Sequence, residues 1–134
     1  MTNIKDLIGL TLDEMLIGKD GEGNDRIAIL ASGRWFTMSH DQDCCESVWV
    51  EDVPTLSADA RGAKIVDASE DITTGCEGYG DTFTATFYRI LTEREDVALT
   101  WRGESNDYYS ESVDFAEWKG ERAPEGRSLF GAAS

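Results

Sequence analysis

A short pattern of residues occurs twice in this sequence, and it restricts the folds that the chain can adopt. The first copy joins Phe36-Thr37-Met38 through a polar loop to Glu46-Ser47-Val48. The second copy joins Leu99-Thr100-Trp101 through a slightly longer loop to Glu111-Ser112-Val113. In both copies an apolar-Thr-apolar strand end precedes an acidic loop, a doubled residue and the opening of a new strand. The pattern predicts two copies of one strand-hairpin-loop-strand module, although two unrelated β-hairpins can also match over so short a stretch.

A fainter similarity suggests where the two modules begin. Asp6-Leu7-Ile8-Gly9 precedes the first expected strand, and Asp59-Ala60-Arg61-Gly62 precedes a later one. We therefore expect a single domain over residues 1–118, built from a pseudo-repeat of about 1–54 and 55–118. The rest of the chain, 119–134, is rich in Gly, Arg, Pro and Ser and is predicted to form a flexible C-terminal tail.

Alternating apolar and polar residues between turn signals predict a mainly β fold, at the margin of α+β. Expected strands cover residues 9–17, 26–30, 34–38, 45–50, 64–67, 82–91, 97–102 and 109–118. A short turn is expected at 3–8, one or two helical turns are expected at 55–61, and a polar loop is expected at 69–80. Because no long amphipathic helix is apparent, the predicted architecture is an antiparallel sheet with short helical turns.

The charge balance limits the partners. Twenty-seven Asp and Glu face twelve Lys and Arg, which gives a net charge of −15, and the excess is shared by both halves of the sequence. Direct binding to nucleic acid or to an anionic membrane is not expected, because both need clustered Lys and Arg. A basic protein surface, a cation, or solvation alone remains open. No apolar leader or transmembrane stretch is apparent, and the odd number of cysteines favours free thiols in a reducing cytoplasm.

The two module loops and the residues beside them form the predicted binding surface. They combine carboxylates with an arginine, an amide and two adjacent tyrosines, a set suited to contacts with a small molecule or with a partner's surface. The predicted binding residues are Asp41, Asp43, Glu46, Arg102, Glu104, Asn106, Asp107, Tyr108, Tyr109 and Glu111.

The first loop also raises the possibility of a metal. His40, Cys44, Cys45 and nearby carboxylates are the residue types that bind zinc. Adjacent cysteines on a strand point to opposite faces, however, and the spacing matches no known metal motif. A polar loop followed by a strand that buries one thiol is the preferred interpretation, so no metal and no cofactor is assigned.

Equivalent carboxylates in the two modules raise the possibility of catalysis. Glu46 and Glu111 could face one another across a pseudo-two-fold axis, which is one way in which paired acids perform acid–base chemistry. No nucleophile–base pair surrounds them and the chain has one histidine, so we expect a protein that is not an enzyme.

Two long motifs carry a resemblance to a known family. The segment His40-Asp41-Gln42-Asp43-Cys44-Cys45-Glu46-Ser47-Val48 and the segment from Gly103-Glu104-Ser105-Asn106 to Tyr108-Tyr109-Ser110-Glu111-Ser112-Val113-Asp114-Phe115 resemble a family of small phage and prophage proteins of unknown function. The opening from Asn3 to Leu12 is similar to that family's usual start. The resemblance implies a phage accessory protein acting in the host bacterial cytoplasm, and it assigns no site residue.

Two functions from different classes are consistent with these observations. The leading hypothesis is a non-catalytic acidic phage protein that binds a host protein and inhibits a host defence system by occupying a basic nucleic-acid-binding surface. The alternative is a protein that sequesters a small molecule or nucleotide in a pocket between the two modules. A homodimer is compatible with either hypothesis.

Overall fold

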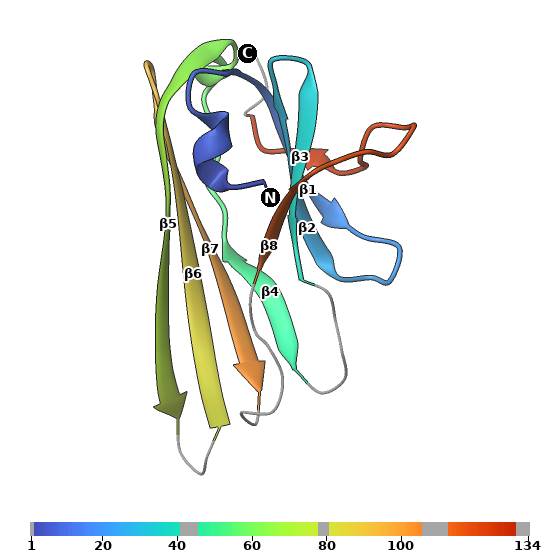
Figure 1. The fold of residues 1–134 in the computed structure, drawn as a ribbon, viewed down its shortest axis with the longest axis vertical. Coiled ribbons are helices and arrows are strands. Elements are labelled where there is room, and N and C mark those ends of the chain that lie inside the picture. The colour runs from blue at the N-terminus through green and yellow to red at the C-terminus, as the bar shows by residue number, and fades with distance from the viewer. Residues whose placement is uncertain (1, 41–45, 78–80, 106–112, 131–134) are drawn as a thin grey trace.

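A computed structural model shows a chain that is mostly β, with 63% of the described residues in strands and 6% in short 3-10 helices, which confirms the predicted fold class (Figure 1). The structure describes residues 2–40, 46–77, 81–105 and 113–130. No helix in this described part of the chain is long and apolar enough to cross a membrane.

The elements follow one another with short connections. In chain order they are η1 (Ile4–Leu7), β1 (Thr11–Lys19), β2 (Asp25–Ala31), β3 (Arg34–Ser39), β4 (Ser47–Asp52), η2 (Ala58–Ala60), β5 (Ala63–Glu77), β6 (Asp81–Thr92), β7 (Asp96–Ser105), β8 (Asp114–Glu117) and β9 (Arg127–Ser128). Both 3-10 helices lead into the first strand of a three-strand meander, β1-β2-β3 and β5-β6-β7.

The strands form one antiparallel sheet in the order β4-β7-β6-β5-β1-β2-β3-β8, with β9 paired to β1 outside this path. β1 and β5 are joined through two register pairs alone, Thr11 with Lys64 and Leu12 with Ala63. We therefore divide the sheet at this narrow junction into a first half, β1-β2-β3-β8, and a second half, β4-β7-β6-β5. Figure 1 shows the two halves side by side, joined near one end.

The fourth strand of each half comes from the other part of the chain. β4 follows β3 in sequence but pairs with β7, and β8 follows β7 but pairs with β3. The hydrogen bonds at the junction have the same reciprocal arrangement. The N–H of Gly9 donates to the carbonyl of Ile65 (2.8 Å), and the N–H of Gly62 donates to the carbonyl of Leu12 (2.7 Å). Both glycines have positive φ, 92° and 84°, which favours glycine at these turns.

Both halves contribute to a single hydrophobic core. Its large, fully buried side chains include Leu12, Met15, Ile27, Ile29, Phe36 and Met38 from the first half and Ile65, Tyr88, Ile90 and Trp101 from the second. In β7 the burial alternates, with Val97, Leu99 and Trp101 directed into this core. The intervening residues of β7 lie on the opposite, outer side of the second half.

The long β5 differs from the sequence prediction, which placed a polar loop at 69–80. The strand continues to Glu77 and pairs with β6 along its length. Ile72, Thr73 and Thr74 are β-branched and suit an extended strand, and pairing with β6 satisfies their backbone groups. The segment looks like a loop in the sequence because this part of the hairpin is exposed, including Ile72 at 53%.

The segment after Glu117 also differs from the flexible tail expected at 119–134. Residues 118–130, which we call the C-terminal strap, end in β9 and in the buried side chains of Leu129 and Phe130. The N–H of Leu129 donates to the carbonyl of Met15, and the N–H of Leu56 donates to the carbonyl of Leu129, each at 2.8 Å. The apolar pair anchors a strap whose composition alone resembles that of a tail.

Candidate functional site

Three of the ten predicted binding residues lie in the described part of the chain: Glu46, Arg102 and Glu104. The other seven lie outside the described residues: Asp41, Asp43, Asn106, Asp107, Tyr108, Tyr109 and Glu111. The cysteines considered as metal ligands, Cys44 and Cys45, also lie outside them.

Arg102 and Glu104 come together on the outer side of β7. Arg102 Nη2 donates to Glu104 Oε2 at 3.1 Å, and the Arg102 guanidinium lies 4.7 Å from the centre of the Phe83 ring. The Phe83 ring in turn covers Gly75, where a Cβ atom would come within 2.5 Å of a ring carbon. An arginine, an aromatic ring and a glycine are thus layered across β7, β6 and β5.

Residues paired directly across neighbouring strands lie on the same face of a sheet. The pairs between β4, β7, β6 and β5 therefore define a surface that crosses four strands. Two rows cross it: Trp49, Arg102, Ala85 and Thr73; and Asp52, Thr100, Phe87 and Asp71. We call these two rows, together with Glu104 and Phe83, the outer face. Phe87 is 42% exposed, and Asp71 lies opposite it on β5. An exposed aromatic side chain with carboxylates around it is suited to contacts with a basic protein surface.

Glu46 does not belong to the outer face. Its side chain is almost fully buried, and its Oε2 lies 3.3 Å from Nε2 of His40, which is buried to a similar degree. Glu46 precedes Ser47 and Val48, and strand alternation places it on the inner side with buried Val48. The pair links the end of β3 to the start of β4, where the chain passes from the first half to the second.

The chemistry of this buried pair is that of a structural link. A general base needs to reach its substrate, whereas His40 is only 4% exposed. Within the described residues, no group of three or more His, Cys, Asp and Glu side chains is arranged to hold a metal ion. His40 and Glu46 both lie in the segment considered for zinc, but their burial follows from the pairing of β4 with β7 instead of β3, which local sequence does not specify.

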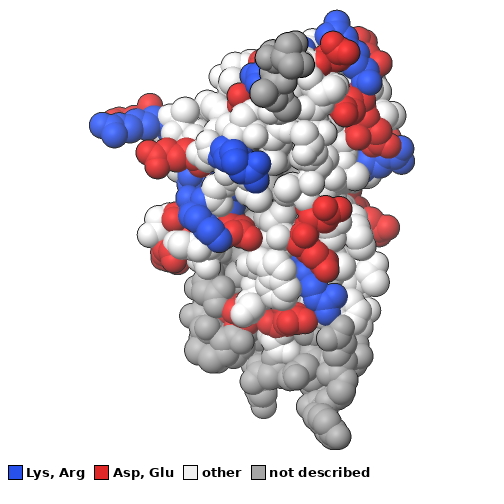
Figure 2. Space-filling view, turned by 180° about the vertical axis from the view of Figure 1, so that it is seen from behind, with Lys and Arg blue, Asp and Glu red and all other residues white. Residues whose placement is uncertain are grey.

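Many surface charges occur as local ion pairs. The pairs join Lys19 to Asp25, Arg34 to Glu117, Arg61 to Glu14, Arg89 to Asp96, and Arg102 to Glu104. The hydrogen bond from Arg89 lowers the pKa of Asp96, and the hydrogen bond from Arg34 lowers the pKa of Glu117. Figure 2 shows acidic residues over the upper and middle parts of one side of the molecule, with Lys and Arg between them.

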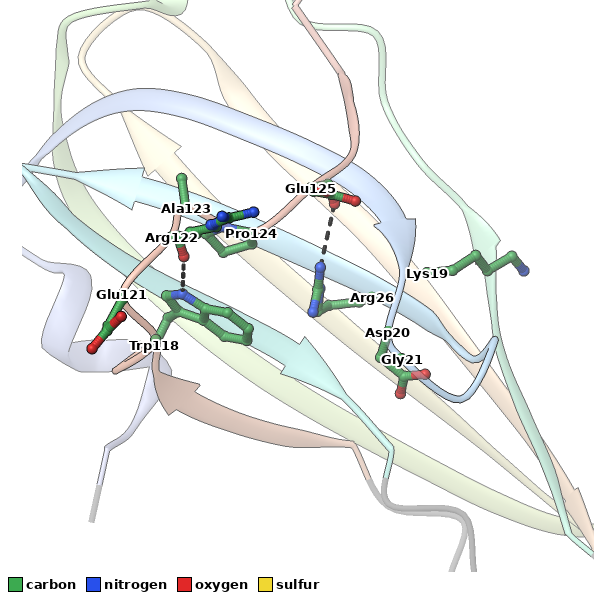
Figure 3. A pocket seen from close by; sticks show the side chains of 11 residues that line it. Lys19, Asp20, Gly21, Arg26, Trp118, Glu121, Arg122, Ala123, Pro124 and Glu125 are labelled. Carbon is green, nitrogen blue, oxygen red and sulfur yellow. Dashed lines mark hydrogen bonds between the residues drawn. The ribbon is translucent and has the colours of Figure 1, made fainter.

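Two hollows lie beside the turn between β1 and β2. A groove of about 390 Å³ separates this turn from β4 and so lies between the two halves, where the alternative hypothesis expects a ligand. Its basic residue, Lys19, already pairs with Asp25. The second hollow, of about 330 Å³, lies under the C-terminal strap and is lined by Arg26, Trp118 and Arg122 (Figure 3). This strap pocket is not predicted from the sequence, because the composition of residues 119–134 indicates a flexible tail.

The sheet and its described surface define a mostly β protein with candidate binding surfaces. The chain belongs to the family described as Domain of unknown function (DUF7448), whose model matches residues 5–115. That match spans both halves of the sheet and ends before the C-terminal strap. No curated protein and no solved structure matches the chain.

Proposed function

We propose that this protein is a non-catalytic phage accessory protein that acts in the bacterial cytoplasm and binds a host protein through the outer face. Its carboxylates take the place of phosphates on a basic surface that otherwise holds nucleic acid, and the contact inhibits a host defence system. Carboxylates on a rigid sheet favour such a partner through electrostatic complementarity, which also speeds encounter.

The observation that carries this proposal is the second of the two rows that cross the outer face, the row from Asp52 to Asp71. Asp52 and Asp71 are both exposed and have no basic partner within ion-pair distance among the described residues. Phe87 lies between them in register, separated from Asp52 by Thr100. An aromatic anchor framed by uncompensated carboxylates supplies apolar contact area and selects for positive charge in the partner.

A pull-down from nuclease-treated host lysate tests the proposal. The wild-type protein should retain, at low salt, a host protein that binds nucleic acid, and added nucleic acid should release it. The double variant Asp52→Asn, Asp71→Asn should retain less, with the larger loss at low salt because salt screens exposed charges.

The matched control is Glu22→Gln with Glu93→Gln, which removes two exposed charges outside the outer face. This control should retain the partner as well as the wild type does. Equal loss in both double variants would mean that only net charge matters, and retention of no nucleic-acid-binding protein at any salt concentration would reject the proposal.

A further inference from the structure

The C-terminal strap follows a closely fitted path over the outer side of the first half. It leaves β8 at Trp118 and reaches the edge of β1 at β9. On the way its backbone lies so near β1 that a Cβ at Gly18 would come within 2.5 Å of the Glu125 carbonyl oxygen. Near its start, the Trp118 indole N–H donates to the carbonyl of Arg122 at 2.7 Å. The strap therefore forms one well-packed wall of the strap pocket.

Arg26 on β2 forms the facing wall, and its guanidinium is incompletely satisfied. The guanidinium lies 5.1 Å from the centre of the Trp118 ring, and Nη2 makes a long contact of 3.4 Å to the Glu125 carbonyl. Nε is buried and has no hydrogen-bond acceptor. A buried donor without an acceptor is unfavourable and uncommon in folded proteins.

An arginine at the other end of the β2–β3 hairpin shows what Arg26 lacks. Arg34 on β3 also lies 5.1 Å from an aromatic ring, that of Phe36, but its Nη2 is 2.8 Å from a carboxylate oxygen of Glu117. Arg26 has no such ion pair among the described residues, although the chain carries twenty-seven acids. The positive charge of Arg26 therefore has no carboxylate partner in the described part of the chain.

The lining of the pocket is less acidic than the chain as a whole. Three bases, Lys19, Arg26 and Arg122, line it together with three acids, Asp20, Glu121 and Glu125. Asp20 Oδ1 is occupied, because it accepts hydrogen bonds from the backbone N–H groups of Glu22 and Asn24 at 2.8 and 3.0 Å. Figure 3 shows the Glu121 carboxylate pointing away from Arg26, with Trp118 between them.

We propose that the strap pocket binds a small organic anion, with a phosphate or carboxylate group on Arg26 and Arg122 and a planar group against Trp118. A ligand carboxylate or phosphate at this edge of the guanidinium would accept from Nη2 through one oxygen and from Nε through another, the side-on donor pair of arginine. The volume of about 330 Å³ lies near the lower end of the range for small-molecule sites. This site uses the strap, beyond the matched residues 5–115, and is independent of docking through the outer face.

Isothermal titration calorimetry with four probes tests this site: adenosine monophosphate, adenosine, inorganic phosphate and benzoate. Adenosine monophosphate or benzoate should bind measurably, and which of them binds identifies the anionic group. Adenosine should not bind, because it lacks that group. Arg26→Gln should weaken binding about tenfold or more, since it removes a charged bidentate donor.

Arg34→Gln is the matched control, because it removes an equally stacked arginine outside the pocket, and it should leave affinity within about twofold. Arg122→Gln replaces the Arg26 variant if that variant does not fold. Three results would each overturn the proposal. The first is that the Arg26→Gln variant binds as tightly as the wild type, and the second is that adenosine binds. The third is that the wild type binds neither adenosine monophosphate nor benzoate. Inorganic phosphate binding as tightly as adenosine monophosphate would overturn the role of Trp118.

Discussion

The two halves of the sheet have the same order of strands, but the outer side of the first half is covered and that of the second half is open. In the first half, β2 buries three consecutive residues, Ile27, Ala28 and Ile29, so both of its faces are covered. In the second half, β7 alternates between buried and more exposed residues, and its outer side carries Arg102 and Glu104. The same architecture thus supports one face closed by the C-terminal strap and one open face.

This difference separates two kinds of recognition in one small molecule. The covered side encloses a pocket between strap and sheet, which is suited to a small ligand. The open side offers a broad surface with exposed Phe87, which is suited to a protein. Because the two halves share one core, they are expected to unfold together with a single free energy of unfolding.

The largest effect is expected from the shared core. Ile29→Ala in the first half and Ile90→Ala in the second should each lower the free energy of unfolding by about 2–5 kcal/mol, because both side chains are fully buried. Urea unfolding followed by fluorescence and by circular dichroism should show one transition that shifts for either variant. Two separate transitions, each sensitive to one variant, would show that the halves unfold independently.

An intermediate effect is expected where the strap touches the first half. Gly18→Ala should cost about 1–3 kcal/mol, because the new Cβ would come within 2.5 Å of the Glu125 carbonyl oxygen and force the strap outward. Gly21→Ala is the control, since a Cβ there would meet nothing within 4 Å. Thermal unfolding compares the two, and equal stability of both variants would contradict the close packing of the strap.

The smallest effect concerns pH and the attachment of β9. Burial alone would raise the pKa of Glu14, but hydrogen bonds from Ser128, from the backbone of Met15 and from Arg61 lower it below its usual value of 4.5. A folded-state pKa below the unfolded one stabilises the fold above pH 4.5, and this contribution is lost as the pH falls through the folded value.

Between about pH 7 and about pH 3.5, wild-type protein should therefore lose up to about 1 kcal/mol more stability than Glu14→Gln does. Urea unfolding at both pH values measures this difference. An identical pH dependence of the two proteins would show that the folded-state pKa of Glu14 is not lowered.

Sequence reasoning identified the elements whose pattern is local. The turn at Ser32 and Gly33 and the glycine-ended turn before β5 depend on neighbouring residues, and both are present. The sequence does not predict the extension of β5 through Glu70 and Asp71, because exposed residues of this segment are polar and a polar segment is typical of a loop. Pairing with β6, rather than hydrophobicity, maintains that strand.

The candidate sites were harder to predict because they depend on partners distant in the chain. Arg102 and Glu104 are two residues apart on one strand, so alternation alone places them on one side. Arg26 and Trp118 meet only because the strap returns across the first half, and periodicity does not reveal that path. The apolar pair Leu129-Phe130 after a polar stretch was the one available sign that the segment is anchored.

The exchange of β4 and β8 also has a consequence for how the chain folds. Met38 and Phe115 lie opposite one another in the sheet although more than half of the sequence separates them. Contacts between such distant segments close large loops, so they form late and slow the reaction, which places this domain among the slower small proteins, with folding times of milliseconds to seconds. Until β8 arrives, the edge of β3 is unpaired, and such an edge can pair with another chain and aggregate.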